Sequence, residues 1–169
     1  TGAYEMRPYR MHRKSPPHPH ERSNAMNLLI LNGPNLNLLG LREPAIYGRQ
    51  SYADLVLMIQ DAAARLGVSA TVRQSNHEGT LVDEIQAAYG VFDGIVFNPA
   101  AYTHTSVALL DALKAVGIPT VEVHISDVSK REDFRQVSFV RQACIATIAG
   151  HGLGGYIEAM ELLKEHLTA

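Results

Sequence analysis

Short apolar runs alternate with longer amphipathic segments along most of the chain. Five runs have the length of buried strands, and glycine, proline or asparagine stands at most of their ends: 27–33, 68–74, 94–98, 119–125 and 144–150. Four segments place apolar residues at helical spacing: 51–66, about 80–89, about 105–116 and 153–167. Strands that alternate with helices in this way predict a parallel sheet with helices on both faces.

The best-marked helix is the one at 51–66. Ser51 precedes it and Asp54 follows three residues later, which is the pattern of a capping box. Gly67 follows its last turn, where glycine commonly ends a helix. Taken with the order of the other elements, this predicts an α/β fold of the flavodoxin-like, doubly wound type, with five parallel strands in the order 2-1-3-4-5.

The first 25 residues differ in composition from the rest of the chain. They hold five of the 15 lysines and arginines, four of the eight prolines and three of the eight histidines. We interpret residues 1–25 as an N-terminal extension or the remnant of an expression tag. Residues 26–169 are then a single domain, and a hydrophobic content of 46% is enough to form one core.

Charge and cysteine content narrow the classes of partner and compartment. Residues 26–169 carry 10 basic and 15 acidic side chains, a formal net charge of −5, which argues against nucleic acid as a partner. No apolar run reaches the roughly 18 residues of a membrane span, so we expect no membrane partner. Cys144 is the only cysteine and lies in an apolar run, which predicts a buried, unreactive thiol and is typical of the cytoplasm.

Polar side chains gather where four successive predicted strands end. The sequence reads Asn-Gly-Pro-Asn at 32–35, Ser-Asn-His-Glu at 75–78, Asn at 98 and Glu-Val-His-Ile-Ser at 122–126. One polar strand end is ordinary turn chemistry. Because ligands of doubly wound sheets bind beyond the carboxyl ends of the strands, four such ends together predict a polar site there.

Two pairs of residues and one histidine near these strand ends each allow a functional and a structural interpretation. Glu122 and His124 face the same side of a strand, so Glu122 can orient the ring as a general acid, or the two form a structural ion pair. His104 stands near a predicted helix N-terminus, as a ligand-binding or a capping residue. Arg131 and Arg135 are predicted to lie on one side of a helical turn, either solvated or clamping an anion.

Neither a cofactor nor a metal is expected from the motifs. The stretch GHGLGG at 150–155 matches G-x-G-x-x-G, but it follows the last predicted strand and only 14 residues come after it. A dinucleotide site needs an acidic residue about 20 positions further on. There is no P-loop and no set of cysteines and histidines with metal-ligand spacing.

Arg42 and Tyr47 stand in the segment LREPAIYG at 41–48, which by itself is most simply a surface turn. Three longer stretches change this interpretation. LNGPNLNLLGLREPAIYG, NPAAYTHTSVALLDAL and VEVHISDVSKREDF together resemble the type II 3-dehydroquinate dehydratases. The resemblance extends over essentially all of 27–167.

The resemblance implies a reaction and the residues that perform it. The family eliminates water from 3-dehydroquinate through an enolate, giving 3-dehydroshikimate in the shikimate pathway, without metal, cofactor or Schiff base. Tyr47 matches its catalytic base, and Arg42 matches the arginine that keeps this tyrosine ionised. His124, partnered by Glu122, matches the acid. Asn35 matches the residue that positions a water against the enolate oxygen.

The resemblance also implies the substrate contacts and the assembly. Ile125 and Ser126 match residues that bind the substrate carboxylate. Arg131 matches a second arginine near the tyrosine. Asp111 matches a residue that reaches the site from a neighbouring subunit, in trimers that assemble into a dodecamer. The residues that match binders of the substrate hydroxyls are Asn98, His104 and Arg135.

Two arginines beside one tyrosine are reasonable on energetic grounds. An ordinary tyrosine has a pKa of about 10, so ionisation near neutral pH requires the pKa to fall by roughly 2–3, or about 3–4 kcal/mol. One adjacent cation lowers a pKa by roughly 1–3. A single arginine is therefore barely sufficient, which favours a role for both Arg42 and Arg131.

Three points stay open at this stage. Dehydration through a lysine Schiff base needs a desolvated lysine, whereas Lys114, Lys130 and Lys164 fall on polar or helical surface positions. A non-catalytic, flavodoxin-like ligand-binding module is the alternative from another class. The stretch VRQACIATIAGHGLGG matches the family least and carries none of the roles above, so we expect its differences to affect core packing rather than chemistry.

Overall fold

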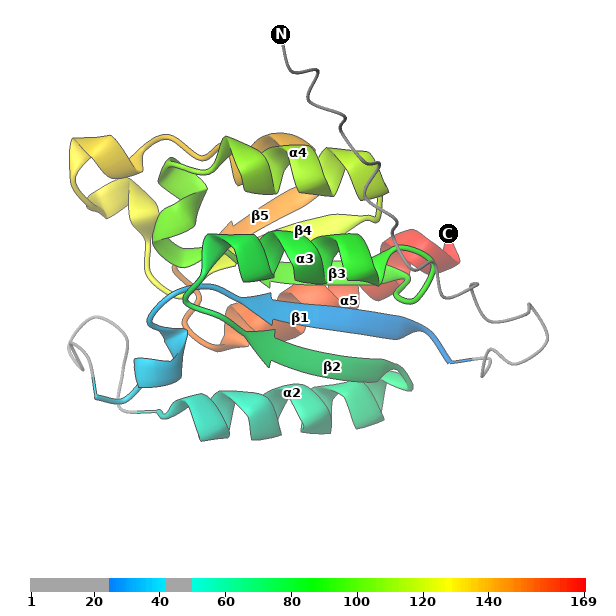
Figure 1. Ribbon diagram of the computed structural model, residues 1–169. Helices are drawn as coiled ribbons and strands as arrows, with labels where there is room; N and C mark the ends of the chain where they lie inside the picture. The colour runs from blue at the N-terminus through cyan, green and yellow to red at the C-terminus, as the bar shows by residue number, and fades with distance from the viewer. Residues whose placement is uncertain (1–24, 42–49) are drawn as a thin grey trace, which may run out of the picture.

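The computed structural model describes residues 25–41 and 50–169, and Arg42 and Tyr47 lie outside this part (Figure 1). One five-stranded sheet, entirely parallel, forms the centre of the fold. Its strands follow the order β2-β1-β3-β4-β5, which confirms the predicted topology. The strands are β1 (Asn27–Asn32), β2 (Ser69–Gln74), β3 (Gly94–Asn98), β4 (Thr120–His124) and β5 (Ala146–Ala149).

Two helices cover each face of the sheet. Residues of α2 (Tyr52–Leu66) and α5 (Gly154–Thr168) enter one apolar cluster. Residues of α3 (Glu78–Ala88) and α4 (Val107–Val116) enter the cluster on the other face. Figure 1 shows the resulting layers of helix, sheet and helix. None of the helices in the described ranges is long and apolar enough to cross a membrane.

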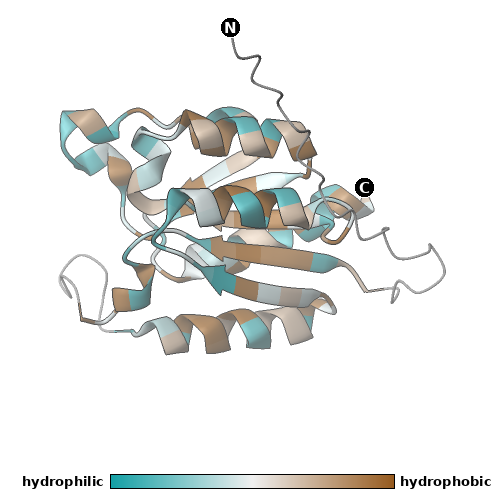
Figure 2. Cartoon of the chain, in the orientation of Figure 1, coloured by the Kyte–Doolittle hydropathy of each residue, from teal (hydrophilic) through white to brown (hydrophobic). Residues whose placement is uncertain are grey.

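Strand β1 lies in the interior of the sheet, between β2 and β3, which explains why its sequence is an unbroken apolar run. Leu28 and Ile30 point into the cluster beneath α2 and α5, whereas Leu29 and Leu31 point into the opposite one. All four are fully buried. A strand buried on both faces is apolar without alternation, and Figure 2 shows the body of β1 in the brown of hydrophobic residues.

Helix α2 has the ends that the sequence predicts. Ser51 accepts a hydrogen bond from the Asp54 amide, and the Asp54 carboxylate accepts one from the Ser51 amide, which completes the capping box. Gly67 ends the helix in the left-handed region, with φ of 67°. Because side chains other than glycine rarely adopt this conformation, the stop is local in origin.

Other boundaries differ from the prediction. Helix α3 starts at Glu78, two residues early, because the Leu81 amide already donates to the His77 carbonyl. The segment before α4 is a separate 3-10 helix, η3 (Ala100–His104), and α4 begins only after Ser106, whose hydroxyl caps it. The fifth strand is confined to Ala146–Ala149, since Gly150 leaves the extended region with φ of 84°.

The predicted helical turn that carries Arg131 and Arg135 is wrong. Two short 3-10 helices occupy this region, η4 (Val128–Lys130) and η5 (Asp133–Arg135). Arg131 lies between them in an extended conformation, with φ of −98° and ψ of −179°. Asp127 begins η4 by accepting a hydrogen bond from the Ser129 amide. The Arg131 amide then donates to the Val128 carbonyl three residues back, which is the hydrogen bond of a 3-10 helix rather than of an α-helix.

Candidate active site

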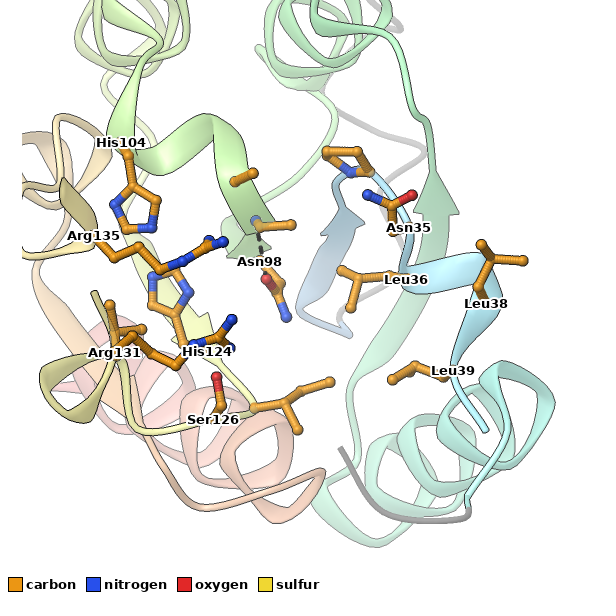
Figure 3. Close-up of a pocket in the computed structure, with 15 residues that line it drawn as sticks. Asn35, Leu36, Leu38, Leu39, Asn98, His104, His124, Ser126, Arg131 and Arg135 are labelled. Atoms are coloured by element: carbon orange, nitrogen blue, oxygen red, sulfur yellow. Dashed lines mark hydrogen bonds between the residues drawn. The ribbon is translucent and has the colours of Figure 1, made fainter. Parts of the chain in front are cut away.

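A cavity of about 140 Å³ opens beyond the carboxyl ends of β1, β3 and β4 (Figure 3). Segments that are far apart in the chain meet around it, since parallel strands end at the same edge of a sheet. Eight residues proposed from the sequence line it: Asn35, Asn98, His104, His124, Ile125, Ser126, Arg131 and Arg135.

The remaining proposed residues lie elsewhere. Glu122 is fully buried beneath His124 rather than in the cavity wall. Asp111 is exposed on α4 and is absent from the lining. Arg42 and Tyr47 belong to the segment outside the described residues. The structure therefore places the proposed acid, His124, in the same cavity as most of the residues proposed to bind the substrate.

Glu122 holds the ring of His124 from below. The Nε2 atom of His124 lies 2.9 Å from Oε1 of Glu122. Burial alone raises the pKa of Glu122, but the hydrogen bond and charge of His124 and the hydroxyls of Thr103 and Ser138 outweigh it and bring the pKa to about 2. An ionised carboxylate only accepts hydrogen bonds, so Nε2 carries a proton and Nδ1 is the ring nitrogen left for a ligand.

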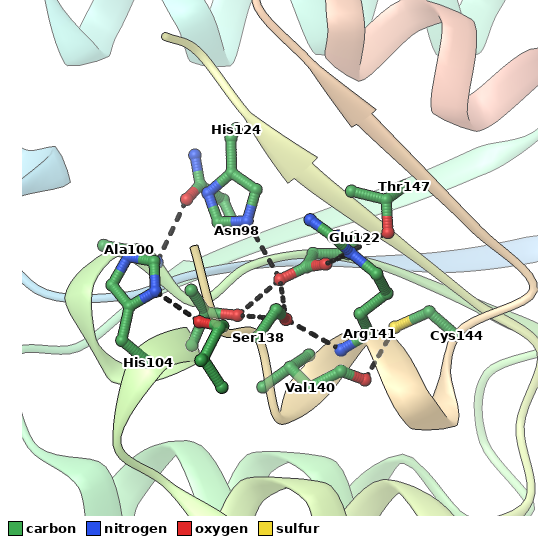
Figure 4. Close-up of polar contacts among 12 residues, drawn as sticks. Asn98, Ala100, His104, Glu122, His124, Ser138, Val140, Arg141, Cys144 and Thr147 are labelled. Atoms are coloured by element: carbon green, nitrogen blue, oxygen red, sulfur yellow. Dashed lines mark hydrogen bonds and ion pairs between the residues drawn. The ribbon is translucent and has the colours of Figure 1, made fainter. Parts of the chain in front are cut away.

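Four further side chains surround the Glu122 carboxylate (Figure 4). Oε1 accepts hydrogen bonds from the hydroxyls of Thr103 and Ser138. Oε2 accepts one from the Thr147 hydroxyl at 3.1 Å, and the Arg141 guanidinium stands 3.6 Å away. A buried charge is stable only when such partners replace water, and this carboxylate has partners on both oxygens.

Thr147 and Arg141 correct an expectation from the sequence. Both belong to the stretch that matches the family least, in which we expected effects on packing alone. In the structure, Thr147 pairs with Glu122 across the β4–β5 register, which places its hydroxyl beside the carboxylate. Divergence in this stretch therefore reaches the proposed acid through Glu122.

His104 is oriented by the backbone on the opposite wall. Its Nδ1 atom lies 2.6 Å from the carbonyl oxygen of Val137. Because a carbonyl only accepts, Nδ1 carries the proton, and Nε2 of a neutral ring is left as an acceptor for a ligand hydroxyl. The residue is half-buried at the end of η3, and Ser106 rather than His104 caps α4, so the capping role considered for His104 is wrong.

Basic side chains line the cavity, whereas its described lining contains no carboxylate. Arg131 and Arg135 both extend along one wall in Figure 3. Their Nε atoms share one exposed acid, Glu132, at 3.5 Å and 2.8 Å. Both guanidinium groups line the cavity and can donate paired hydrogen bonds to an anionic ligand.

Backbone strain is concentrated at this cavity. Among the described residues, the non-glycine positions with positive φ are Asn35, at 67°, and Ala100, at 51°, and both line it. Gly33 is needed nearby, since a Cβ atom there would stand 2.5 Å from the carbonyl oxygen of Pro99. Strained residues cluster at functional sites because the surrounding structure must hold them.

Two further expectations concern reactive groups. Burial, followed by the charge of Glu122, raises the pKa of the Cys144 thiol to about 12, so it stays protonated and unreactive, although the residue is partly rather than fully buried. Within the described residues, no three histidine, cysteine, aspartate or glutamate side chains are grouped to hold a metal ion.

The fold and this cavity correspond to a known family. The sequence model described as "Dehydroquinase class II" matches residues 26–164. The chain belongs to this family. It is 48% identical to a 3-dehydroquinate dehydratase of Clostridium acetobutylicum, over 85% of this chain and 99% of that protein. It is 50% identical to a catabolic 3-dehydroquinase of Verticillium alfalfae, over 85% and 95%.

Two solved structures are similar to this chain. The type II dehydroquinase from Butyrivibrio crossotus is 48% identical and superposes with a TM-score of 0.82, over 83% of this chain and 99% of that one. A 3-dehydroquinate dehydratase-like protein from Bifidobacterium longum is 27% identical, with a TM-score of 0.64 over 85% and 99%. The match covers almost the whole length of both structures.

The residues that donate hydrogen bonds to the Glu122 carboxylate were missed from the sequence. Thr103 and Ser138 are ordinary turn residues by composition, and neither stands at a strand end. A signal existed for Thr147, because the predicted fifth strand neighbours the fourth in the predicted strand order. Residues on adjacent parallel strands share a face, so a hydroxyl there was a candidate partner for Glu122.

Proposed function

We propose that this protein is a type II 3-dehydroquinate dehydratase, a hydro-lyase that eliminates water from 3-dehydroquinate to give 3-dehydroshikimate. The observation that carries the proposal is an oriented histidine above a buried, ionised carboxylate, in a cavity of a class II dehydroquinase that Arg131 and Arg135 also line. The substrate is an anion with several hydroxyls. A wall of two arginines and a histidine acceptor suits both kinds of group.

The elimination proceeds in two proton transfers. Tyrosinate 47, kept ionised by Arg42 and Arg131, takes a proton from the carbon beside the ketone, and the electron pair moves onto the ketone oxygen as an enolate. Asn35 holds a water against this oxygen. The enolate then collapses to a carbon–carbon double bond while the hydroxyl leaves, and His124 gives it a proton so that it departs as water.

The geometry of His124 supports its role as the acid. With Nε2 donating to Glu122, a second proton on Nδ1 faces the cavity and can be given to a leaving oxygen. Glu122 stabilises the doubly protonated ring before the transfer. Protons return to His124 and leave Tyr47 through solvent, which restores the starting state without a cofactor.

The remaining polar groups are proposed to hold the substrate. Ser126 and the backbone at Ile125 lie at the end of β4, where they bind the carboxylate. Asn98, His104 and Arg135 bind the hydroxyls. These contacts fix the reacting carbon against the base, and positioning of this kind contributes a large part of catalysis.

We also propose that the active form is a homo-oligomer built from trimers, assembling to a dodecamer. Asp111 is exposed on α4 and outside the lining of its own cavity. A contribution from Asp111 to substrate binding therefore requires a neighbouring chain. Its position on the outer surface of a helix is compatible with such a contact.

Turnover of 3-dehydroquinate, followed by the absorbance of the enone product, tests the proposal. We expect Tyr47→Phe to lower turnover by about 10²–10⁴, because it removes the proton acceptor and keeps the ring. His124→Asn also lowers turnover but retains exchange of the proton beside the ketone in deuterated water, whereas Tyr47→Phe blocks this exchange. Substrate binding without any turnover by the unmodified protein would identify a ligand-binding module instead.

A further inference from the structure

Both polar atoms of the Asn98 side-chain amide form hydrogen bonds within the protein. Its Oδ1 atom accepts a hydrogen bond from the backbone amide of Ala100 at 3.1 Å. Its Nδ2 atom donates to the hydroxyl of Tyr156 at 2.8 Å. A backbone amide can only donate, so an amide group turned by 180° would set two donors against each other at Ala100. The orientation of Asn98 is thus determined by its partners.

Tyr156 makes this arrangement directional. Its hydroxyl has one proton, which it donates to Oδ1 of Asn32 at 2.7 Å while it accepts from Asn98. The hydrogen bonds therefore run one way, from Asn98 to Tyr156 to Asn32. Beyond Asn32, a long contact of 3.5 Å from its Nδ2 atom reaches the hydroxyl of Tyr52.

We call this series of hydrogen bonds, from Asn98 through Tyr156 and Asn32 to Tyr52, the relay. Most of it lies beneath the cavity rather than in the cavity wall. Asn32 and Asn98 are register partners on the neighbouring strands β1 and β3, so both side chains point to the same face of the sheet. Tyr156 covers them from α5 and is fully buried. Asn98 lines the cavity, whereas Tyr156 does not. Tyr156 can therefore influence a ligand through Asn98 and not by touching it.

We propose that Tyr156 is a positioning residue that fixes the Asn98 amide for the substrate. An amide nitrogen has two protons, and Tyr156 takes one of them. The other remains as a donor at a fixed place in the cavity, aimed at a substrate oxygen. This inference rests on the proposed function and adds to it a reason why this core tyrosine has a hydroxyl.

The alternative is a purely structural role. Tyr156 lies in the apolar cluster under α2 and α5, and a buried hydroxyl needs partners wherever it stands. In that case its removal lowers stability and leaves substrate affinity unchanged. The hydroxyl of Tyr156 is hydrogen-bonded to the cavity-lining residue Asn98. The two interpretations therefore differ in whether the effect of removing this hydroxyl on the substrate depends on Asn98.

The test compares Tyr156→Phe with Tyr52→Phe in the full-length protein. Each removes one tyrosine hydroxyl from the same relay, but Tyr52 stands at its far end. We expect Tyr156→Phe to raise KM for 3-dehydroquinate about tenfold with a smaller change in kcat, which is the effect of one neutral hydrogen bond. Tyr52→Phe is expected to leave KM within about twofold, because the Asn98–Tyr156–Asn32 hydrogen bonds remain.

A double-mutant cycle separates positioning from stability. In an Asn98→Ala background, Tyr156→Phe is expected to change KM no further, while its effect on the urea midpoint persists. An unchanged KM in Tyr156→Phe, an equal rise in Tyr52→Phe, or an undiminished effect in the Asn98→Ala background would each overturn the inference. If Tyr156→Phe does not fold, Asn32→Ala replaces it, since the tyrosine proton then loses its acceptor and KM is again expected to rise.

The two proposals fail in different ways. An unmodified protein that does not turn over 3-dehydroquinate contradicts the proposed function, whatever the variants do. Normal turnover by the unmodified protein together with a KM that is insensitive to Tyr156→Phe contradicts the role of Tyr156 alone.

Discussion

Replacing Glu122 with glutamine is expected to remove a large part of the acid sensitivity of this protein's stability. The pKa of Glu122 is about 2 in the folded protein and 4.5 ordinarily. Since the folded value is the lower one, the stabilisation is fully present above about pH 4.5 and is lost as the pH falls through about 2. The difference, 4.5 minus about 2, corresponds to about 3 kcal/mol.

Glutamine keeps the shape of the side chain and removes its charge. We therefore expect Glu122→Gln to be less stable than the unmodified protein at pH 7 by about 3 kcal/mol, and this gap to shrink by about 2 kcal/mol at pH 3. At low pH the protonated acid resembles the amide, which is why the two proteins converge. Lowered pKa values of exposed acids cancel in the comparison, because both proteins contain them: Asp54, Asp127 and Glu132.

Urea unfolding of both proteins between pH 7 and pH 3 measures the gap. The protein concentration must be the same throughout, since any self-association contributes to the apparent stability. The free energy of unfolding comes from the midpoint and the slope at each pH. Curves that stay parallel over this range would refute the reasoning, because they would mean that Glu122 is no more acidic in the folded state than in the unfolded one.

Four other outcomes are expected. Thr147→Val removes a donor to Glu122 and lowers the free energy of unfolding in urea by about 1–2 kcal/mol; an equal loss in Thr71→Val, on the distant strand β2, would contradict this. Ala100→Gly, at a positive φ, raises that free energy by up to about 1 kcal/mol, and a lower stability would show that Ala100 is not strained. Activity survives a chelator, and it survives borohydride with substrate; substrate-dependent inactivation would indicate an imine. Light scattering of the active protein gives the mass of a multiple of three chains, and a monomer mass would exclude a role for Asp111 across subunits.

The fold was predictable because its strongest signals are local. Leu28 to Leu31 are apolar on both sides of one strand, and this run needs no partner to be recognised. The caps of α2 are equally local, since Ser51, Asp54 and Gly67 interact with their own helix. Helix boundaries that depend on neighbouring segments were predicted less accurately. The start of α4 depends on η3, whose backbone turns at the strained Ala100.

Much of the candidate site was also predictable, for a topological reason. Asn35, Asn98, His124 and Ser126 follow or end strands of a parallel sheet, and such strands deliver their ends to one edge. Arg131 and Arg135 were placed at the site despite a wrong prediction of their local structure. Their place after β4 in the chain mattered more than the type of turn that carries them.

By itself, the sequence determined the strands, most of the helices, their order, and the polar residues at the strand ends, because these follow from local patterning and from the resemblance to a family. Only the tertiary structure decided which side chains support the site from beneath. Thr103, Ser138 and Thr147 converge on Glu122 from three separate segments, and Tyr156 reaches Asn98 from the last helix. Such contacts join residues distant in the chain, and burial makes them obligatory, since a carboxylate or amide removed from water must find partners wherever the fold places them.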